Sequence, residues 1–272
     1  MVKITVDNNF FNTELLTNPR PLGDFDNDRI SFYPSFELIG EFLSMYGTQK
    51  GNERLRRYSE IFLQMNPKRI INSWRDLLLN QLGIQQSQLY VDERLEDSLR
   101  QILHKLAQSQ SLNIEEEDSI VKIKERVNSG KKTMGIRYEE AKSLYKIQNN
   151  YRDFEDFYSR RGDVIQKVII KKIFQDNQVP INDSSIIEII NALDTKPYLN
   201  LYSRIYSAFV FYHYITNQNN QKIDGNDFYD HLYLIYLVDV DYLITYERRL
   251  KTLAELVFPG ENKVGKITFE VE

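Results

Sequence analysis

Cysteine is absent from this chain of 272 residues, and no apolar run is long enough to span a lipid bilayer. The missing cysteine excludes a disulfide framework and any zinc or iron–sulfur site that thiolates ligate. The most apolar stretch, residues 232–244, is shorter than a transmembrane helix and carries Asp239 and Asp241. The first residues also lack the basic and apolar segments of a secretory signal, so we expect a cytoplasmic protein without a membrane partner.

Several signatures of catalysis are missing as well. The sequence has no glycine-rich phosphate loop and no nucleophile elbow. Its three histidines, His104, His213 and His231, share no metal-binding spacing. A packed or surface position is the default for each, although His231 stands beside the acidic Asp230. The net charge of −4 argues against a surface coated with basic residues for gripping nucleic acid.

Basic residues nevertheless gather in two runs, at 122–132 and 160–172. Glutamate and aspartate are interleaved in or beside both runs, which is typical of a solvated helix face. A local groove for nucleic acid is the sharper alternative. The eighteen tyrosines would supply rings on which unpaired bases can stack, although most of them are expected in the core.

The two ends of the chain have the pattern of an α/β unit. Short strands are predicted where apolar and β-branched residues cluster or alternate, at 2–6, 30–33, 242–245 and 267–271. Helices are predicted before or after these strands, because apolar residues recur there with helical spacing, at 10–16, 36–45, 227–237 and 247–256. Alternation of strands and helices favours a small parallel sheet that is built from both ends of the chain.

Between these ends, from about residue 50 to residue 215, the sequence predicts one helix after another. Apolar residues recur three and four positions apart, which gives each helix one apolar side. The expected helices are 54–65, 70–82, 93–107, 138–147, 154–174 and 198–215. The predicted class is therefore α/β, with residues 1–49 and 196–272 as the sheet core and residues 50–195 as a helical insertion or subdomain.

Acidic residues follow the predicted strands or lie on the helices beside them: Asp7, Glu37, Glu41, Asp227, Asp230 and Glu247. Because ligands of open parallel sheets bind at the carboxyl ends of the strands, we expect these carboxylates to converge. Two like charges about 4 Å apart repel by roughly 4 kcal/mol at an effective dielectric constant near 20, so the cluster needs a cation or raised pKa values. Mg²⁺ or Mn²⁺ would satisfy it, and such a site suits hydrolysis of phosphodiesters.

Each acidic position also has a purely structural interpretation. Asp7 can be a turn residue, and the two glutamates after the second strand can belong to the solvated face of an amphipathic helix. Either aspartate of the later pair can cap a helix, and Glu247 can stabilise the positive end of a helix dipole. The joint pattern, rather than any one residue, favours a shared site.

Three segments near the chain ends resemble the PIN-like nuclease family. Residues 4–11 (Ile-Thr-Val-Asp-Asn-Asn-Phe-Phe) resemble its opening strand, which ends in Asp-x-Asn. Residues 226–232 (Asn-Asp-Phe-Tyr-Asp-His-Leu) resemble the Asn-Asp-x-x-Asp helix of bacterial PIN-like proteins. Residues 240–250 resemble the strand and the Thr-x-Asp turn that follow that helix. The resemblance covers about 1–45 and 195–258.

The resemblance implies a PIN-like parallel sheet with a large helical insertion, and it implies a set of site residues. The metal-binding and catalytic carboxylates of the family fall on Asp7, Glu41, Asp230 and Glu247. Supporting positions fall on Asn9, Asp227, Thr245 and Glu37, the last as an alternate to Glu41. Glu247 stands where the family normally has aspartate. Its side chain is longer by a methylene group and is still able to ligate a metal.

The expected function is metal-dependent hydrolysis of RNA or another single-stranded nucleic acid, with Mg²⁺ or Mn²⁺ as the cofactor. The resemblance implies a bacterial setting, as a toxin paired with an antitoxin or as part of a defence system. The alternative is a PIN-like interaction protein without catalysis, which binds a protein or nucleic-acid partner through its helical segment. Glu247 and the negative net charge favour the alternative, whereas Asp7, Asn9 and Asp230 favour the nuclease.

Overall fold

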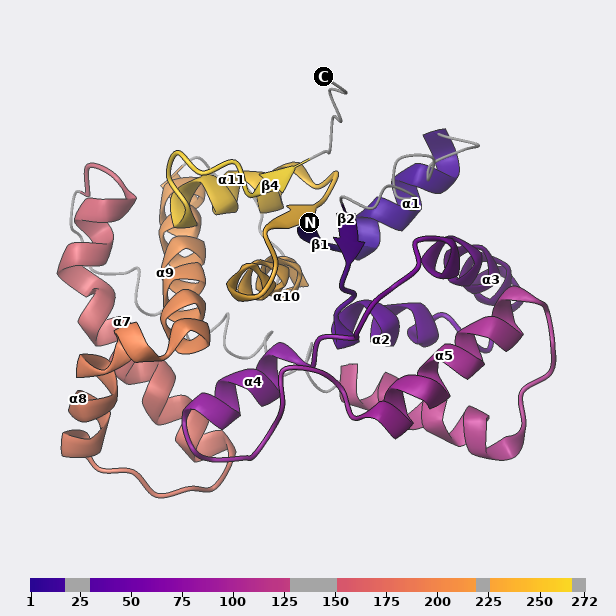
Figure 1. The fold of residues 1–272 in the computed structure, drawn as a ribbon. Coiled ribbons are helices and arrows are strands. Elements are labelled where there is room, and N and C mark those ends of the chain that lie inside the picture. The colour runs from indigo at the N-terminus through magenta and orange to yellow at the C-terminus, as the bar shows by residue number, and fades with distance from the viewer. Residues whose placement is uncertain (18–29, 128–150, 219–225, 266–272) are drawn as a thin grey trace.

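The computed structural model describes residues 1–17, 30–127, 151–218 and 226–265. Of these, residues 13–17, 213–218 and 226–228 are described by their backbone alone. The described chain is mostly helical and contains a four-stranded sheet near its centre (Figure 1). The predicted α/β class with a small parallel sheet is therefore confirmed.

The sheet consists of β1 (Val2–Val6), β2 (Ile30–Phe32), β3 (Tyr242–Ile244) and β4 (Val264–Gly265), in the order β2-β1-β3-β4. All of its pairings are parallel, and Ile4 of β1 pairs with Phe32 on one side and with Tyr242 on the other. The second half of β1 is buried because it has neighbours on both edges, which suits its β-branched residues. The first strand thus lies beside the strand near residue 242, as the sequence predicts.

The outer edge of the sheet differs from the expectation. β4 contains two residues, one of them Gly265 with a φ of 155°, and the sequence pattern does not indicate it. So short a strand carries too few side chains to show an alternation of apolar and polar residues. The predicted strand at 267–271 lies outside the described residues.

The helices at the chain ends connect the strands and cover the sheet. They are α1 (Asn8–Thr17), α2 (Phe36–Ser44), α9 (Pro197–Gln218), α10 (Asn226–His231) and α11 (Arg248–Val257). Ser35 caps α2 by accepting a hydrogen bond from the backbone N–H of Leu38, 3.2 Å away. This cap fixes where the helix starts after β2, and therefore where its acidic residues lie.

The segment after α10 winds as a 3₁₀-helix, η2 (Leu232–Val238), and not as the continued α-helix that the sequence predicts. Its residues from Leu232 to Leu237 are all buried. The segment therefore has no polar side, and the sequence pattern cannot show whether it winds as an α-helix or as a 3₁₀-helix. In a 3₁₀-helix, residues three positions apart lie on the same side. Tyr233 and Tyr236 therefore point the same way, toward α2.

The middle of the chain is helical, as predicted, with η1 (Leu193–Thr195) as a short 3₁₀ turn. Its helices are α3 (Gln49–Gln64), α4 (Trp74–Gln81), α5 (Glu93–Ala107), residues 114–127, α7 (Phe154–Asp176) and α8 (Asp183–Asn191). The bounds of α5 match the prediction, α8 was not foreseen, and the predicted helix at 138–147 lies outside the described residues.

The start of α4 departs from the prediction, which placed it at Ile70. Residues Ile70 and Ile71 are extended instead, because the Ile71 N–H donates to Pro34 O at 2.8 Å and Ile70 O accepts from the Val91 N–H at 2.9 Å. These bridges use the backbone groups that a helix would need. The helix begins only at Trp74, next to the carboxyl end of β2.

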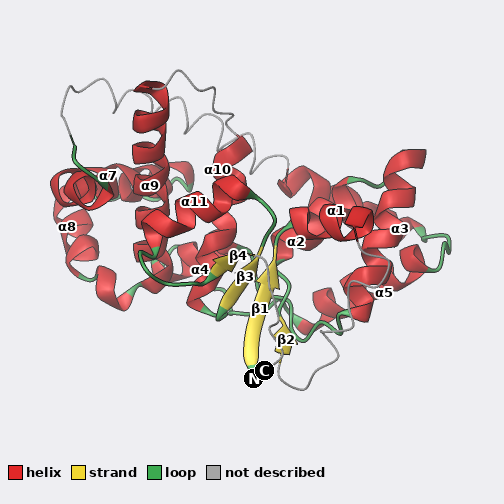
Figure 2. Cartoon of the chain, turned by 90° about the horizontal axis from the view of Figure 1, so that it is seen from above, coloured by secondary structure: helices red, strands yellow, loops and turns green. Residues whose placement is uncertain are grey.

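Two groups of helices flank the sheet (Figure 2). The helices α1, α2, α3 and α5 lie on one side, and α7, α8, α9 and α11 lie on the other (Figures 1 and 2). One hydrophobic cluster takes in buried residues from the sheet, the end helices and the middle helices. The division into a core of 1–49 and 196–272 and an insertion of 50–195 stays a prediction. Among the described helices, none has the length and apolar content to cross a membrane.

Phe42 of α2 tests how much this core stabilises the fold. Its fully buried ring packs edge-on against Phe11, Tyr58 and Phe62, at centroid distances of 4.6, 5.2 and 6.1 Å. We expect Phe42→Ala to lower the free energy of unfolding by about 3–5 kcal/mol, because it removes buried apolar area and leaves a cavity. Urea unfolding measures the loss. Val164→Ala, at a position that is 47% exposed, should cost less than about 0.5 kcal/mol, and equal losses would contradict this packing.

Candidate acidic site

Asp7 lies directly after β1, at the carboxyl edge of the sheet, and is 3% exposed. Both of its carboxylate oxygens accept hydrogen bonds. Oδ2 accepts from the hydroxyl of Thr245 at 2.6 Å, and Oδ1 accepts from the backbone N–H of Phe10 at 3.1 Å. Thr245 follows β3, so the parallel pairing of β1 with β3 is what brings these two residues together although 238 positions separate them.

Glu247 extends this arrangement. Its backbone N–H donates to Thr245 Oγ1 at 2.9 Å, and its carboxylate accepts from the side-chain amide of Asn9 at 2.8 Å. A chain of hydrogen bonds therefore runs from Asn9 through Glu247 and Thr245 to Asp7. All four are residues that the sequence assigns to the site, and they come from opposite ends of the chain.

Glu41 enters from α2 and is 6% exposed. Its carboxylate accepts a hydrogen bond from the Tyr233 hydroxyl at 3.0 Å. Burial raises the pKa of Asp7 to about 7; the bonds from Thr245 and Phe10 oppose the rise, and repulsion by Glu247 and Glu41 adds to it. Glu41 and Glu247 thus both act electrostatically on Asp7 at the edge of the sheet.

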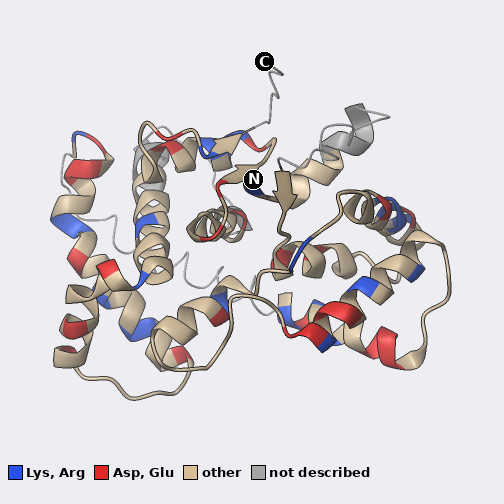
Figure 3. Ribbon diagram, viewed as in Figure 1, with Lys and Arg blue, Asp and Glu red and all other residues tan. Residues whose placement is uncertain are grey.

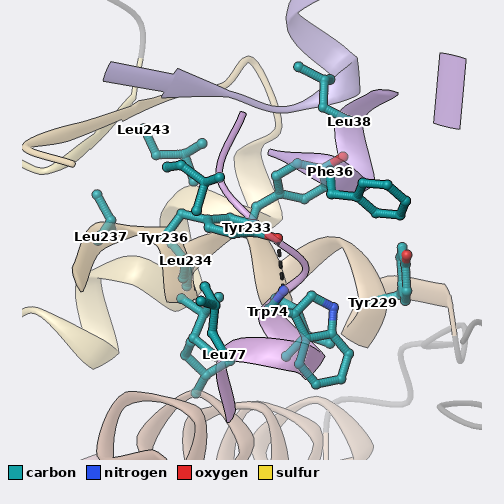
Figure 4. Packing of buried hydrophobic residues seen from close by; sticks show 14 of the residues in the cluster. Phe36, Leu38, Trp74, Leu77, Tyr229, Tyr233, Leu234, Tyr236, Leu237 and Leu243 are labelled. Carbon is teal, nitrogen blue, oxygen red and sulfur yellow. Dashed lines mark hydrogen bonds between the residues drawn. The ribbon is translucent and has the colours of Figure 1, made fainter. Parts of the chain in front are cut away.

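Glu37 lies one helical turn before Glu41 but makes contacts of its own. Its Oε1 accepts from the Ser73 hydroxyl at 2.8 Å, and its Oε2 accepts from the Tyr236 hydroxyl. The backbone N–H of Trp74 donates to the same Tyr236 oxygen at 3.1 Å, as Figure 4 shows. Burial is also the main reason that the pKa of Glu37 rises to about 7. Of the two glutamates, Glu41 is therefore the one that belongs with Asp7.

The surroundings of these glutamates decide between two interpretations of α2. Glu37 and Glu41 are 5% and 6% exposed, so the solvated helix face is wrong for both. The sequence shows that they share a face but gives no sign of the hydroxyl donors that compensate their burial. Those donors, Ser73, Tyr233 and Tyr236, are the site residues that the sequence analysis missed. The tyrosines stand close to the Asn-Asp motif in sequence, which is the one signal that points to them.

The two aspartates of α10 are less completely placed. Asp230 is partly buried. Burial raises the pKa of the neighbouring Tyr229, and the charges of Glu37, Glu41 and Asp230 add to the rise. The side chain of Asp227 lies outside the described residues. His231 is buried with its ring against Phe209, at a centroid distance of 5.6 Å, which agrees with the packed position that is the default for a histidine.

The donor set suits a hard divalent cation in its chemistry. Carboxylate oxygens dominate it, and an amide and a hydroxyl lie beside them, the groups that Mg²⁺ and Mn²⁺ prefer. A positive charge would also offset the repulsion that raises the pKa of Asp7. Within the part of the chain that the structure describes, however, no three His, Asp or Glu side chains form a group that could hold a metal ion as they stand. Binding would require the carboxylates to turn toward one point.

The basic runs are scattered among acidic residues on the helices (Figure 3). Arg160 pairs with Asp156 at 2.9 Å and Lys172 with Asp176 at 3.6 Å, each within one turn of α7. Arg126 forms an ion pair with Asp76 on α4. These pairs favour the solvated helix face over a continuous basic groove in the described parts of both runs.

Comparisons with protein-family models, with curated proteins and with solved structures found no match to this chain. The PIN-like resemblance stays an inference from residues at the two ends of the chain. Function has to be inferred from the carboxylates, their partners and their place on the sheet.

The raised pKa of Asp7 predicts a dependence of stability on pH in the absence of metal. The folded protein holds this proton up to about pH 7, whereas the unfolded chain releases it near pH 4, so Asp7 lowers stability as the pH rises from 4 to 7. We expect Asp7→Asn to remove this loss, which amounts to a few kcal/mol because each pKa unit corresponds to about 1.4 kcal/mol. Urea unfolding in EDTA at pH 4, 5, 6 and 7 measures both proteins. A gap between wild type and Asp7→Asn that stays constant over this range would show that Asp7 is not protonated in the fold. Asp163→Asn, at an exposed position of α7, is the matched control.

Proposed function

We propose that this chain is a metal-dependent nuclease of PIN-like type, which hydrolyses RNA at the carboxyl edge of its parallel sheet. The observation that carries the proposal is that Glu41 and Glu247 both act on the charge of the buried Asp7 at this edge. Asp7 follows β1, Glu41 lies on α2 and Glu247 lies in the turn after β3. Buried acids that repel one another lower stability, so proteins keep them mainly where function needs them.

A divalent cation is the partner that such a cluster calls for. Asp7, Glu41 and Glu247 would hold it, and Asp230 would complete the set from α10. When bound, an ion of this class activates water for attack and neutralises the charge of a phosphodiester. RNA is the proposed substrate. An antitoxin or another protein partner belongs to the same proposal through the family resemblance.

The remaining residues of the site hold these carboxylates in position. Thr245 donates its hydroxyl proton to Asp7 and accepts from the Glu247 N–H, so one side chain orients two acidic residues. Asn9 fixes the far end of Glu247. Tyr233 does the same for Glu41. Each bond stabilises a negatively charged oxygen and fixes the direction in which that carboxylate points.

One observation favours the second candidate, a PIN-like protein that binds a partner without catalysis. In the described residues, the carboxylates are not gathered into a group of three that could hold a metal. A decayed site would keep its protein hydrogen bonds without gathering its carboxylates around an ion. The two experiments that follow separate the candidates, since a binding protein of this kind would neither take up the ion nor cleave RNA.

Metal binding should be visible as a gain in stability. We expect Mn²⁺ to raise the melting temperature of the wild-type protein, because a ligand that binds only the folded state stabilises it. Asp7→Asn and Asp230→Asn should lose most of that rise, since each removes a charged ligand. Asp163→Asn, on the exposed side of α7, should keep it. Differential scanning fluorimetry with and without Mn²⁺ measures the shift, and an equal shift in all four proteins would place any metal elsewhere.

Cleavage of RNA tests the activity itself. Purified protein should cut a labelled single-stranded RNA in Mg²⁺ or Mn²⁺ and should stop in EDTA, because a phosphate is repelled by bare carboxylates. Asp7→Asn should reduce the rate at least about a hundredfold, as loss of an electrostatic catalytic group commonly does, and Asp163→Asn should leave it unchanged.

A variant at Glu247 tests the position at which this chain departs from the family pattern. If Glu247 is a working ligand, Glu247→Asp should change the rate modestly or alter the preference between Mg²⁺ and Mn²⁺. Wild-type protein that cuts neither RNA nor DNA in either metal, over a broad set of substrates, would contradict the nuclease. A gain of cleavage in Glu247→Asp alone would identify a site that has decayed at that position.

A further inference from the structure

The helix of residues 114–127 packs on α5 and α2, on one side of the sheet. Glu116 forms an ion pair with Lys105 of α5, with 2.6 Å between Oε1 and Nζ. Val127 packs closely on Gly40 of α2, where a Cβ would lie 2.6 Å from Val127 Cγ2. These contacts fix the rotation of the helix about its axis, and its opposite side is exposed to solvent.

That exposed side, called the acidic face here, alternates apolar and acidic residues over about 16 Å of helix. Positions four, three and four residues apart share one side of a helix. The exposed residues with this spacing are Ile114, Asp118, Val121 and Glu125. Ile114 is 79% exposed and Val121 is 51% exposed. Among the described residues, neither of the two acids has an ion-pair partner.

Helix α7 lies on the other side of the sheet and presents an exposed side of the opposite charge (Figures 1 and 2). This basic face consists of Val164, Lys167, Val168 and Lys171, which are all exposed and stand three or four positions apart. The ion pairs within α7 engage Arg160 and Lys172. The two lysines of the basic face have no such partner in the described part of the chain.

The two faces complement each other. The acidic face carries two negative charges and the basic face two positive charges, and each face also presents two branched apolar side chains. Helices with apolar residues three and four apart pack along a common seam, and opposite charges beside the seam select the partner. The sheet and its covering helices lie between the faces (Figure 2), so they do not meet within one molecule. They can meet between two molecules.

We propose that the basic face of one molecule packs against the acidic face of a second copy of this chain. The lysines then lie beside Asp118 and Glu125, and the valines cover Ile114 and Val121. The contact joins two different surfaces, so each pair keeps one free face of each kind and a third copy can add. Neither face contains a residue of the acidic site at the sheet edge, so this inference is independent of the proposed nuclease function.

Analytical ultracentrifugation of the full-length protein in EDTA tests the association without any variant. A single pair of helices makes a small interface, so we expect weak association over about 10–500 μM. The weight-average mass should rise with concentration and pass twice the monomer mass, because the contact propagates. Salt at about 0.5 M should weaken the association at least about tenfold, since it screens exposed charges. A protein that stays monomeric over this range overturns the proposal.

Charge reversal identifies the two faces. Lys167→Glu with Lys171→Glu reverses the basic face, and Asp118→Lys with Glu125→Lys reverses the acidic face. Each double variant alone should associate at least about tenfold more weakly, because like charges then meet. An equimolar mixture of the two should associate again, since the intact basic face of one variant meets the intact acidic face of the other.

A matched control reverses two exposed basic residues of α3, Lys50→Glu with Arg57→Glu, and should associate as the wild type does. Association that persists in both reversed variants overturns the proposal, as does a loss without recovery on mixing when circular dichroism shows that both variants are folded. Wild-type protein that is monomeric and binds single-stranded RNA through Lys167 and Lys171 would assign the basic face to nucleic acid and also overturn it.

Discussion

The parallel pairing of β1 with β3 is the constraint on which the rest of the structure depends. It places the residue after β1 beside the residues after β3, so that Asp7 and Thr245 form a hydrogen bond across 238 positions. Parallel strands need long crossover connections, and here nearly the whole chain is that connection. The helical middle is thus free to vary in size while the carboxyl edge of the sheet stays the meeting point of both ends.

A second constraint is the burial of acidic groups behind that edge. Glu37 and Glu41 of α2 are buried away from water, and a tyrosine hydroxyl of η2 donates a hydrogen bond to each of them. The 3₁₀ winding of η2 makes this possible because residues three apart then face the same side. The arrangement lowers stability at neutral pH, where ionised carboxylates are costly in a buried place. The Mn²⁺ or Mg²⁺ ion proposed above would relieve that cost near Asp7.

Local signals in the sequence predicted much of the fold and part of the site. The β-branched run of β1 and the apolar spacing of α5 depend on neighbours in sequence, and these predictions are confirmed. The placement of Asp7 beside Thr245 and Glu247 followed from the topology of parallel sheets. The partners of Glu37 could not be predicted, because Ser73 and Tyr236 reach it from distant elements. The winding of η2 was missed because a segment that is buried on every side shows no period.

A crystal structure of the protein soaked in Mn²⁺ tests the central claim most directly, because anomalous scattering locates the ion without reference to activity. The account predicts a peak at the carboxyl edge of the sheet, about 2.0–2.3 Å from an oxygen of Asp7 and in contact with Glu41 or Glu247. It also predicts that the peak disappears in Asp7→Asn crystals. A peak at any other place, or none at this edge while the carboxylates keep only their bonds to Thr245, Asn9 and Tyr233, would contradict it.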